Sequence, residues 1–536
     1  MPVSEYCAMN PKQVFVRDAT GLVRSLSYVD ALFLSLAVTG PNYLSYVLQM
    51  NFVGGVDPGA DIVLSGIYGL LFMIPLCIMY YFFVIVMPRS GGDYVWLTRV
   101  LNPVIGFIGG WGMWVSWIVL FAGTSVIFAS VVVPVFFATL GYAWNIPSWV
   151  SFAVNFSNLD VIFLVALLFC ACGILINSRG PSVYCGTMRI LAVVQWVGTF
   201  LCLYVLATTS NQTFVAAFNH YAGLNVTYTG VMQAAKASGW SFTPIFTGAT
   251  LLAIPFGVLW FNGFNWSASA AGEIRNVKTG MLWGIVGALI IDAIINLLGV
   301  YWGVNMVGYE FNQAALYVSS ANPSAWPFAV GPWLSLFTPM VVQNPVVLFL
   351  IQLSWLTSWI WWVGALMFGV SRYVFAFSFD RMLPVRFADI SDRFKFPLNA
   401  TAVCVVVGVI FIYLTDFTTY IGTYLNSTAI FAIVWVLVSI AAIIFPYKKK
   451  ELAALLPGAK WKVPLISIVG VVCLVCMSMT VFYAFTTPAV GPSTPLSDVI
   501  LAVIFGLGAV VFVVRYFYLK KQGIDILLAA REIPPE

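Results

Sequence analysis

The chain has 536 residues, of which 61% are hydrophobic and 8% are charged, whereas a soluble domain carries about 25% charged residues. This composition excludes an ordinary soluble domain and predicts a membrane protein with many spans. The net charge is +5, and the single histidine, His220, excludes a metal site built on several imidazoles as well as a Ser/His or Cys/His dyad within the membrane.

Twelve apolar stretches are long enough to be membrane helices, each of which needs about 20 apolar residues. They lie near 25–50, 61–87, 104–138, 159–177, 184–209, 244–272, 280–304, 345–378, 398–415, 424–445, 463–486 and 497–518. The polar segment 1–24 precedes the first stretch, so we expect a cytoplasmic tail and no cleavable signal peptide. Residues 519–536 form a second short tail.

The basic residues predict how these spans are oriented, because cytoplasmic loops collect Lys and Arg. If both termini are cytoplasmic, Lys236 is the one residue among the 24 Lys and Arg that falls outside. We therefore expect a multi-pass protein of the plasma membrane with cytoplasmic N- and C-termini. The positive charge follows from this topology and does not indicate nucleic acid binding. The nine cysteines fall in spans or on the inner side, so no structural disulfide is expected.

The first span is interrupted at mid-depth by Thr39, Gly40 and Pro41. Thr39 or Gly40 can cap a restarted helix, and Pro41 suits its first turn because an N–H there would lack a partner anyway. The free amides that follow would suit a carboxylate. A proline kink is the simpler alternative. The candidate binding residues here are Val38, Thr39, Gly40, Pro41 and Asn42.

The sixth span, 244–272, is interrupted by Pro255, Gly257, Asn262 and Gly263. Unwound backbone survives in the hydrocarbon region only where it is buried or lines a cavity, so the break is a binding-site hypothesis, with a kink again as the alternative. Carbonyls freed from 257 to 259 would suit a cation or an ammonium group, and amides after 262 would suit an anion. The candidates are Gly257, Leu259, Trp260, Asn262 and Gly263, with Phe261 and Phe264 beside them.

Two broken helices that are five spans apart indicate an inverted repeat, which is typical of secondary transporters. We expect an all-α integral membrane protein of twelve helices, with broken helices 1 and 6. The expected first repeat is 25–209 and the second is 244–445, separated by an extracellular loop at 210–243 and followed by two further spans in 446–518. A second outer loop is expected at 305–344.

Asp292 is the one acidic residue that we place at mid-membrane, and Asn296 follows one turn later on the same face. A carboxylate is costly there and is a functional hypothesis by default, although a structural Asp satisfied by Asn296 is the alternative. A proton is therefore a possible coupling ion. Thr357 and Ser358 offer hydroxyls for sodium, but nothing else supports it.

Four stretches, in this order and spacing, resemble the amino acid, polyamine and organocation (APC) transporter superfamily. They are Pro88 to Tyr94 with Gly110-Trp111, INSRGPSVYCGTMR at 176–189, GFNWSASAAGEIRNVKTG at 263–280 and SRYVFAFSFDRMLP at 371–384. The resemblance covers most of the chain up to residue 400. It implies an amino acid permease with the 5+5 inverted repeat of the leucine-transporter-like fold.

The resemblance also implies pocket residues on span three and span eight. By position these are Leu120, Phe121, Ser125, Trp362 and Leu366. The chain departs from the family pattern at Thr39-Gly40-Pro41, where a Gly-x-Gly break is usual, and at Asn276-Val277, where Asn-Pro is usual. Several relatives carry an acidic residue where this chain has Asn265. The resemblance therefore favours a neutral amino acid over dibasic or polyamine substrates.

The leading hypothesis is a secondary active transporter that moves a small-molecule amino acid by alternating access, as a proton-coupled carrier or an exchanger, without a cofactor. The alternatives are a membrane sensor that binds an amino acid without moving it, and a sodium-coupled or organic-cation or polyamine transporter of the same fold. An enzyme is not expected, since no nucleophile, base, metal or phosphate-loop pattern is recognisable. The sequence leaves the amino acid and the oligomeric state open.

Overall fold

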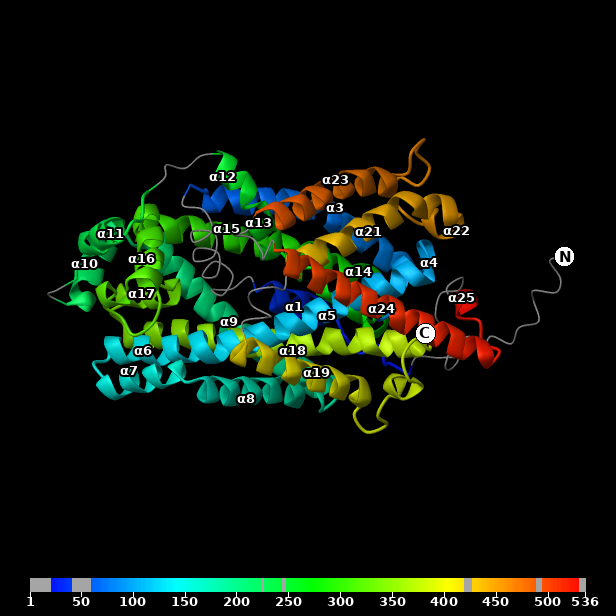
Figure 1. Ribbon diagram of the computed structural model, residues 1–536, viewed down its shortest axis with the longest axis horizontal. Coiled ribbons are helices and arrows are strands. Elements are labelled where there is room, and N and C mark those ends of the chain that lie inside the picture. Colours follow the sequence, from blue (N-terminus) through cyan, green and yellow to red (C-terminus); the bar gives the residue numbers. More distant parts are fainter. Residues whose placement is uncertain are drawn as a thin grey trace.

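The computed structural model describes residues 21–40, 59–223, 226–242, 247–418, 427–487 and 494–529. These residues form a bundle of helices without a β-strand (Figure 1). Ten helical segments among them are long and apolar enough to cross a membrane. They are α3 (Ile62–Val86), Pro103–Ala143 (α5, η3 and α6), α8 (Leu159–Asn177), α9 (Pro181–Thr208), Val277–Val307 (α14, η6 and α15), α18 (Pro345–Phe379), α19 (Leu398–Phe417), α21 (Ser427–Lys448), α23 (Leu465–Thr486) and α24 (Pro495–Lys521).

These ten segments coincide with ten of the twelve predicted spans, and the other two are those for which a break was predicted. The described part of the first span is α1 (Tyr28–Thr39). The sixth span consists of α12 (Thr247–Leu252), α13 (Ile254–Trp260) and η5 (Trp266–Glu273). The multi-span helical architecture is thus confirmed, while the inverted-repeat arrangement stays a prediction.

Several long helices begin with proline at the first helical position, where the missing N–H costs no hydrogen bond. These are α5 at Pro103, α9 at Pro181, α18 at Pro345 and α24 at Pro495. In α5 and α18 the preceding asparagine caps the helix, as when Asn102 accepts a hydrogen bond of 2.8 Å from the amide of Val104. Local sequence therefore specifies where these spans start.

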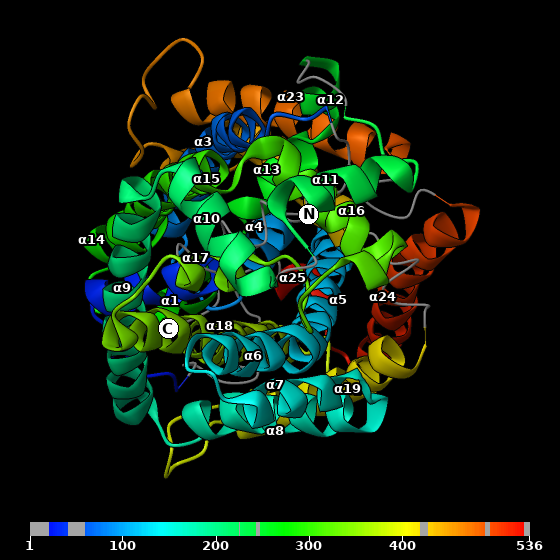
Figure 2. The ribbon, with the colours of Figure 1, turned by 90° about the vertical axis from the view of Figure 1, so that its left-hand side faces the viewer.

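One end of the bundle is covered by short helices, and we call it the capped end. The expected outer loops 210–243 and 305–344 contain α10 (Asn211–Ala222), α11 (Tyr228–Ala237), α16 (Tyr309–Ala321), η7 (Pro323–Ala325) and α17 (Leu334–Met340). Figure 2 looks onto this end and shows α10, α11, α16 and α17 lying across it. Their aromatic side chains pack together, with Tyr228 stacked on Phe311 at 4.0 Å between ring centroids. Short amphipathic helices lack a long apolar run, so the sequence indicated only loops here.

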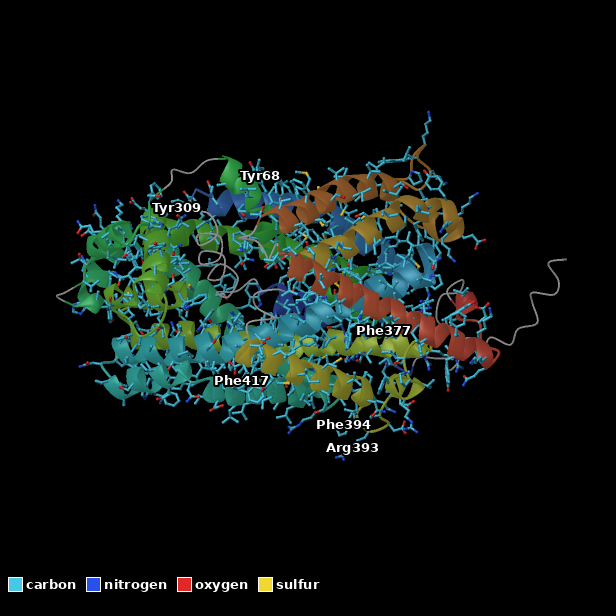
Figure 3. The ribbon with its side chains drawn as sticks, in the orientation of Figure 1. Tyr68, Tyr309, Phe377, Arg393, Phe394 and Phe417 are labelled. Atoms are coloured by element: carbon cyan, nitrogen blue, oxygen red, sulfur yellow. The ribbon has the colours of Figure 1, made fainter. Side chains whose placement is uncertain are left out.

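Two more short helices, α7 (Pro147–Val154) and η4 (Asn155–Ser157), follow α6 at the capped end. In Figure 3, Tyr309 lies towards this end, where its hydroxyl donates to the carbonyl of Ala60 beside the start of α3. The same figure shows Arg393 and Phe394 near the surface towards the opposite end, with the guanidinium 5.1 Å from the ring centroid.

We call the opposite end the basic end, because the described loops with most Lys and Arg lie there. It carries α4 (Asp93–Val100), η8 (Val385–Ala388), α22 (Lys450–Ala453) and α25 (Ile526–Ala529), while Lys236 on α11 belongs to the capped end (Figure 1). The positive-inside rule requires this grouping. The side of the membrane that the basic end faces stays a prediction.

Ion pairs tie helices together near the basic end. They join Arg99 to Asp380 at 2.6 Å, Arg372 to Glu273 at 2.8 Å and Arg189 to Asp30 at 2.8 Å. The first two are buried, whereas the Arg189 side chain is half exposed. Residues 26 and 274 also form a parallel bridge, which joins the segment before α1 to the end of η5. The first and sixth spans are thus fastened together at this end.

Candidate functional site

The break in the first span is a helix end at a glycine. α1 stops at Thr39, and Gly40 adopts the left-handed conformation with φ 62° and ψ 59° while its N–H donates to the carbonyl of Leu36. A residue with a Cβ is disfavoured in this conformation, which explains the glycine. The predicted helix restart falls on Pro41 and Asn42, which lie outside the described residues.

The break in the sixth span comes later than the glycine-proline pattern indicated. α13 starts with Pro255 in its first turn and runs through Gly257 to Trp260. A turn over 261–265 follows, in which Gly263 has φ 109°, and η5 begins at Trp266. The carbonyl of Leu259, expected to be free, accepts the amide of Asn262 at 3.1 Å. The carbonyl of Leu259 is therefore occupied by a hydrogen bond within the turn and, contrary to the prediction from the sequence, is not free to bind a cation.

Gly257 and Trp260 face a neighbouring helix. A Cβ on Gly69 of α3 would lie 2.0 Å from the backbone carbon of Gly257, and one on Gly66 would lie 2.0 Å from the Trp260 ring. The Ser65 hydroxyl donates to the carbonyl of Ala253 at 3.0 Å. Small residues let two membrane helices approach closely, so α13 is held tightly against α3.

The two breaks touch each other. A Cβ on Gly263 would lie 2.7 Å from Cγ1 of Val38 and 2.9 Å from the amide nitrogen of Thr39. Just beyond the turn, the amide of Ser267 donates to the hydroxyl of Ser35 in α1 at 3.0 Å. The predicted binding residues Val38, Thr39 and Gly263 are thus in direct contact, and Gly40 follows Thr39 in the chain.

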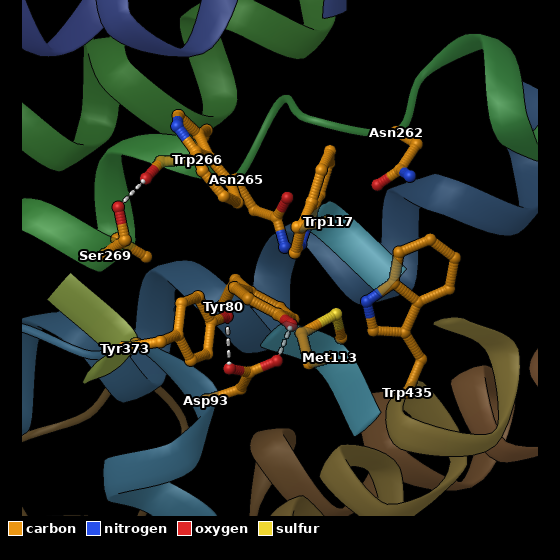
Figure 4. A pocket seen from close by; sticks show the side chains of 12 residues that line it. Tyr80, Asp93, Met113, Trp117, Asn262, Asn265, Trp266, Ser269, Tyr373 and Trp435 are labelled. Carbon is orange, nitrogen blue, oxygen red and sulfur yellow. Dashed lines mark hydrogen bonds between the residues drawn. The ribbon is translucent and has the colours of Figure 1, made fainter. Parts of the chain in front are cut away.

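A small cavity lies on the basic side of the span-six turn, and Asn262, Asn265 and Trp266 contribute to its wall (Figure 4). Its free volume is about 10 Å³, room for about one water molecule. The side-chain carbonyl oxygens of Asn262 and Asn265 are buried and accept no hydrogen bond from a described residue. The cavity therefore presents amide oxygens without partners beside the break, and it is too small for an amino acid in this conformation.

Asp93 supplies a carboxylate to the same cavity. Gly91 and Gly92, with φ 105° and 53°, turn the chain so that α4 begins at Asp93, and the amide of Gly91 donates to the carbonyl of Ser269 in η5. The Asp93 side chain is 1% exposed. It accepts hydrogen bonds from the hydroxyl of Tyr373 at 2.7 Å and that of Tyr80 at 3.1 Å (Figure 4).

The environment of Asp93 favours its neutral form. Burial raises the pKa of the Asp93 carboxyl from 3.8 to about 6, although the hydrogen bonds from Tyr373 and Tyr80 lower it. A buried carboxylate with hydroxyl partners and no cation binds a proton more readily than one in water.

Aromatic rings form the rest of the wall. Trp117 of α5 packs on Trp266 with 4.4 Å between ring centroids and on Phe431 with 4.8 Å. The indole N–H of Trp266 donates to the carbonyl of Ala365 in α18 at 2.8 Å, which fixes that ring. Met113 and Trp435 also line the cavity. Large apolar walls with a few polar groups are typical of sites for small organic ligands.

The residues carried over from the resemblance lie elsewhere. Phe121 packs against Gly408 of α19, and the Ser125 hydroxyl donates to the carbonyl of Phe121 at 2.7 Å. Leu120 is half-buried, while Trp362 and Leu366 are buried in α18. Of the predicted binding residues that the structure describes, Asn262 alone lines the cavity. The sequence reasoning missed Asp93 and the residues around it, although Asp93 belongs to the recognised P-x-S-G-G-x-Y stretch.

The predicted coupling pair lies apart from this cavity. Asp292 and Asn296 are fully buried in α15, and the amide of Asn296 donates to one carboxylate oxygen of Asp292 at 2.7 Å. No described residue donates to the other oxygen. Neither residue lines the cavity beside the span-six turn.

Comparison with known proteins identifies the family. The model of the family described as amino acid permease matches residues 26–507. A branched-chain amino acid permease of Lactococcus lactis subsp. cremoris is 21% identical over 390 residues, which cover 71% of this chain and 72% of that protein. An uncharacterised protein of Sulfolobus islandicus rod-shaped virus 1 is 21% identical over 291 residues, which cover 54% of this chain and 59% of the viral protein. With its match over almost the whole chain and its many apolar helices, the protein belongs to the amino acid permease family of multi-pass membrane transporters.

Proposed function

We propose that this permease is a secondary active transporter that moves a neutral amino acid across the plasma membrane by alternating access. In this proposal twelve spans form a 5+5 inverted repeat, and the basic end faces the cytoplasm. The observation that carries it is the direct contact between Gly263 and the end of α1. Two helix breaks that meet at mid-membrane, five spans apart, are the substrate-site arrangement of inverted-repeat transporters.

The tight packing around the breaks supports an alternating mechanism. The cavity beside them has room for about one water molecule. Short helices cover the capped end, and buried ion pairs join helices at the basic end. An amino acid can enter only if one of these ends opens and the breaks separate, so the described conformation is a closed one.

A neutral, apolar side chain fits the surroundings best. Trp117, Trp266 and Trp435 line the cavity, and Asn265 contributes an uncharged amide where an acid would favour a dibasic substrate. The similar Lactococcus protein is named for branched-chain amino acids, which agrees with this class.

Asp93 supports one competing candidate, a cationic amino acid or polyamine, because its carboxylate could pair with a second amino group.

Counterflow with purified protein in liposomes tests the function. Vesicles loaded with unlabelled leucine should take up labelled leucine, isoleucine and valine, and lysine and putrescine should compete poorly. Uptake of labelled lysine or putrescine in preference to leucine would replace the neutral substrate by a cationic one. Leucine binding, measured as a raised unfolding temperature, without any counterflow would indicate a sensor.

A matched pair of variants tests the site. Asn262→Ala removes a buried amide that lines the cavity, and losing one hydrogen bond of about 0.5–1.5 kcal/mol should raise the half-saturating leucine concentration about twofold to tenfold. The exposed Asn155, far from the breaks on η4, is the control, and Asn155→Ala should change nothing. If the half-saturating leucine concentration is the same in both variants, the cavity does not take part in substrate binding.

A further inference from the structure

Asp93 differs from the buried Asp380 and Glu273 in that no Lys or Arg in the described part of the chain forms an ion pair with it. Asp380 is paired with Arg99 of the same short helix as Asp93, and Glu273 is paired with Arg372 in a two-pronged contact of 2.8 and 2.9 Å. The guanidinium groups of Arg99 and Arg372 thus already have carboxylate partners. A buried carboxylate is stabilised best by a cation, so Asp93 must instead rely on hydroxyl donors or bind a proton.

The groups that face Asp93 are uncharged. Tyr80 contributes a hydroxyl from α3 and Tyr373 one from α18. The cavity walls from η5, α5 and α21 add Ser269, Met113, Trp117 and Trp435, and the span-six turn adds two asparagines. Among the described residues that line the cavity, there is no Lys, Arg, His, Glu or second Asp. The charge of this site therefore depends on whether the Asp93 carboxyl holds a proton.

Asp93 also connects two packed groups of helices. Tyr80 belongs to α3, which packs tightly on α13 and so on the first half of the sixth span. Tyr373 belongs to α18, which packs on α8 and α9. The ionised carboxylate accepts a hydrogen bond from each tyrosine and so holds the two groups together at the basic side of the break.

We propose that Asp93 is the site that binds and releases the coupling proton of this permease, in place of Asp292. This inference rests on the proposed function, since it assigns the proton to the same pathway. The proton binds to a carboxylate oxygen of Asp93 and later leaves the same oxygen on the other side of the membrane, with no other bond made or broken. The raised pKa of the carboxyl, about 6, suits a group that exchanges protons near neutral pH.

Protonation changes what Asp93 can bond to. A neutral carboxyl gains one O–H donor and loses the charge that strengthens the two tyrosine hydrogen bonds. The amide oxygens of Asn262 and Asn265 in the same cavity accept no hydrogen bond from a described residue, and they can take the new donor directly or through one water molecule. Protonation of Asp93 therefore weakens the two hydrogen bonds through which it joins α3 and α18. It also adds a hydrogen bond to the span-six turn, where substrate is proposed to bind.

The test uses the full protein in liposomes with an inward pH gradient of one unit, which can support about tenfold leucine accumulation if one proton moves with each leucine. Wild type should approach this ratio, and Asp292→Asn should match it. Asp93→Asn should lose accumulation, reaching a ratio near one, yet still show leucine counterflow without a gradient. Asp93→Glu should recover part of the accumulation.

A second variant reports on the proton itself. Tyr373 lowers the pKa of Asp93 by its hydrogen bond, so Tyr373→Phe should raise that pKa and move the pH midpoint of leucine counterflow to a higher value. A merely structural role for Asp93 does not predict this direction.

Several outcomes would overturn the proposal. They are full pH-driven accumulation by Asp93→Asn, loss of accumulation in Asp292→Asn alone, wild type that exchanges leucine but ignores the pH gradient, and an unchanged midpoint in Tyr373→Phe. Wild type without any leucine counterflow would instead contradict the proposed function, so the two failures are distinguishable.

Discussion

Gly263→Ala probes the contact between the two helix breaks. The added Cβ would lie 2.7 Å from Cγ1 of Val38 and 2.9 Å from the backbone nitrogen of Thr39, both well inside ordinary van der Waals distance. The backbone at this position has φ 109°, a region that residues with a Cβ rarely adopt. The neighbour on one side is backbone, which cannot rotate away as a side chain can.

The magnitude follows from these two effects. Holding a non-glycine residue in a sparsely populated backbone conformation costs about 1–3 kcal/mol, and forcing an extra methyl into a packed interior costs about 1–3 kcal/mol. We therefore expect Gly263→Ala to destabilise the closed contact by about 2–6 kcal/mol. Since the added methyl group would lie between two protein segments, Gly263→Ala should impair folding as well as substrate binding.

The assay is thermal unfolding of purified protein in detergent, with and without leucine. Gly123→Ala is the matched control, because it lies in the described helix α5 and a Cβ there would meet nothing within 4 Å. The control should unfold at or slightly above the wild-type temperature, since alanine favours a helix by about 1 kcal/mol over glycine. If Gly263→Ala unfolds at the same temperature as Gly123→Ala, the two breaks do not touch as described and the reasoning fails.

Three further predictions address the basic end, the cavity wall and the topology. Arg372→Met leaves Glu273 buried without its cation and should lower the free energy of unfolding by about 3–5 kcal/mol. Adding Glu273→Gln should recover part of this loss. Equal unfolding temperatures of the single and double variants would argue against a coupled ion pair. Trp266→Phe removes an indole donor to a buried carbonyl and should cost about 1–3 kcal/mol in the denaturant unfolding free energy, and an unchanged value would show that the bond is not formed. On intact cells a membrane-impermeant maleimide should label Gln212→Cys and spare Lys460→Cys, and the reverse pattern would invert the proposed topology.

The apolar spans could be predicted from the sequence because the thickness of a membrane sets the minimum length of an apolar helix. A helix must satisfy its own backbone hydrogen bonds across a hydrocarbon core of about 30 Å, so each span is a local run of about 20 apolar residues. Ten predicted stretches reappear as long helices. Gly40 and Gly263 were also identified locally, as glycines that interrupt an apolar stretch, and both have positive φ angles in the structure, which favour a residue without a Cβ.

The contents of the site could not be predicted in the same way, because they depend on which faces of distant helices meet. Asp93 follows two glycines in what the sequence presents as an inner loop, and only the packing of α4 between α3 and α18 buries it beside the span-six turn. Phe121 and Ser125 were assigned to the pocket by position, yet Phe121 packs on α19, while Trp117, one turn earlier, lines the cavity. Trp117 and Phe121 are four residues apart, so they lie on nearly the same face of α5 but about 6 Å apart along its axis. Which of the two lines the cavity depends on the level at which α5 meets the span-six turn, and that level is decided by tertiary packing rather than by the apolar pattern of the chain.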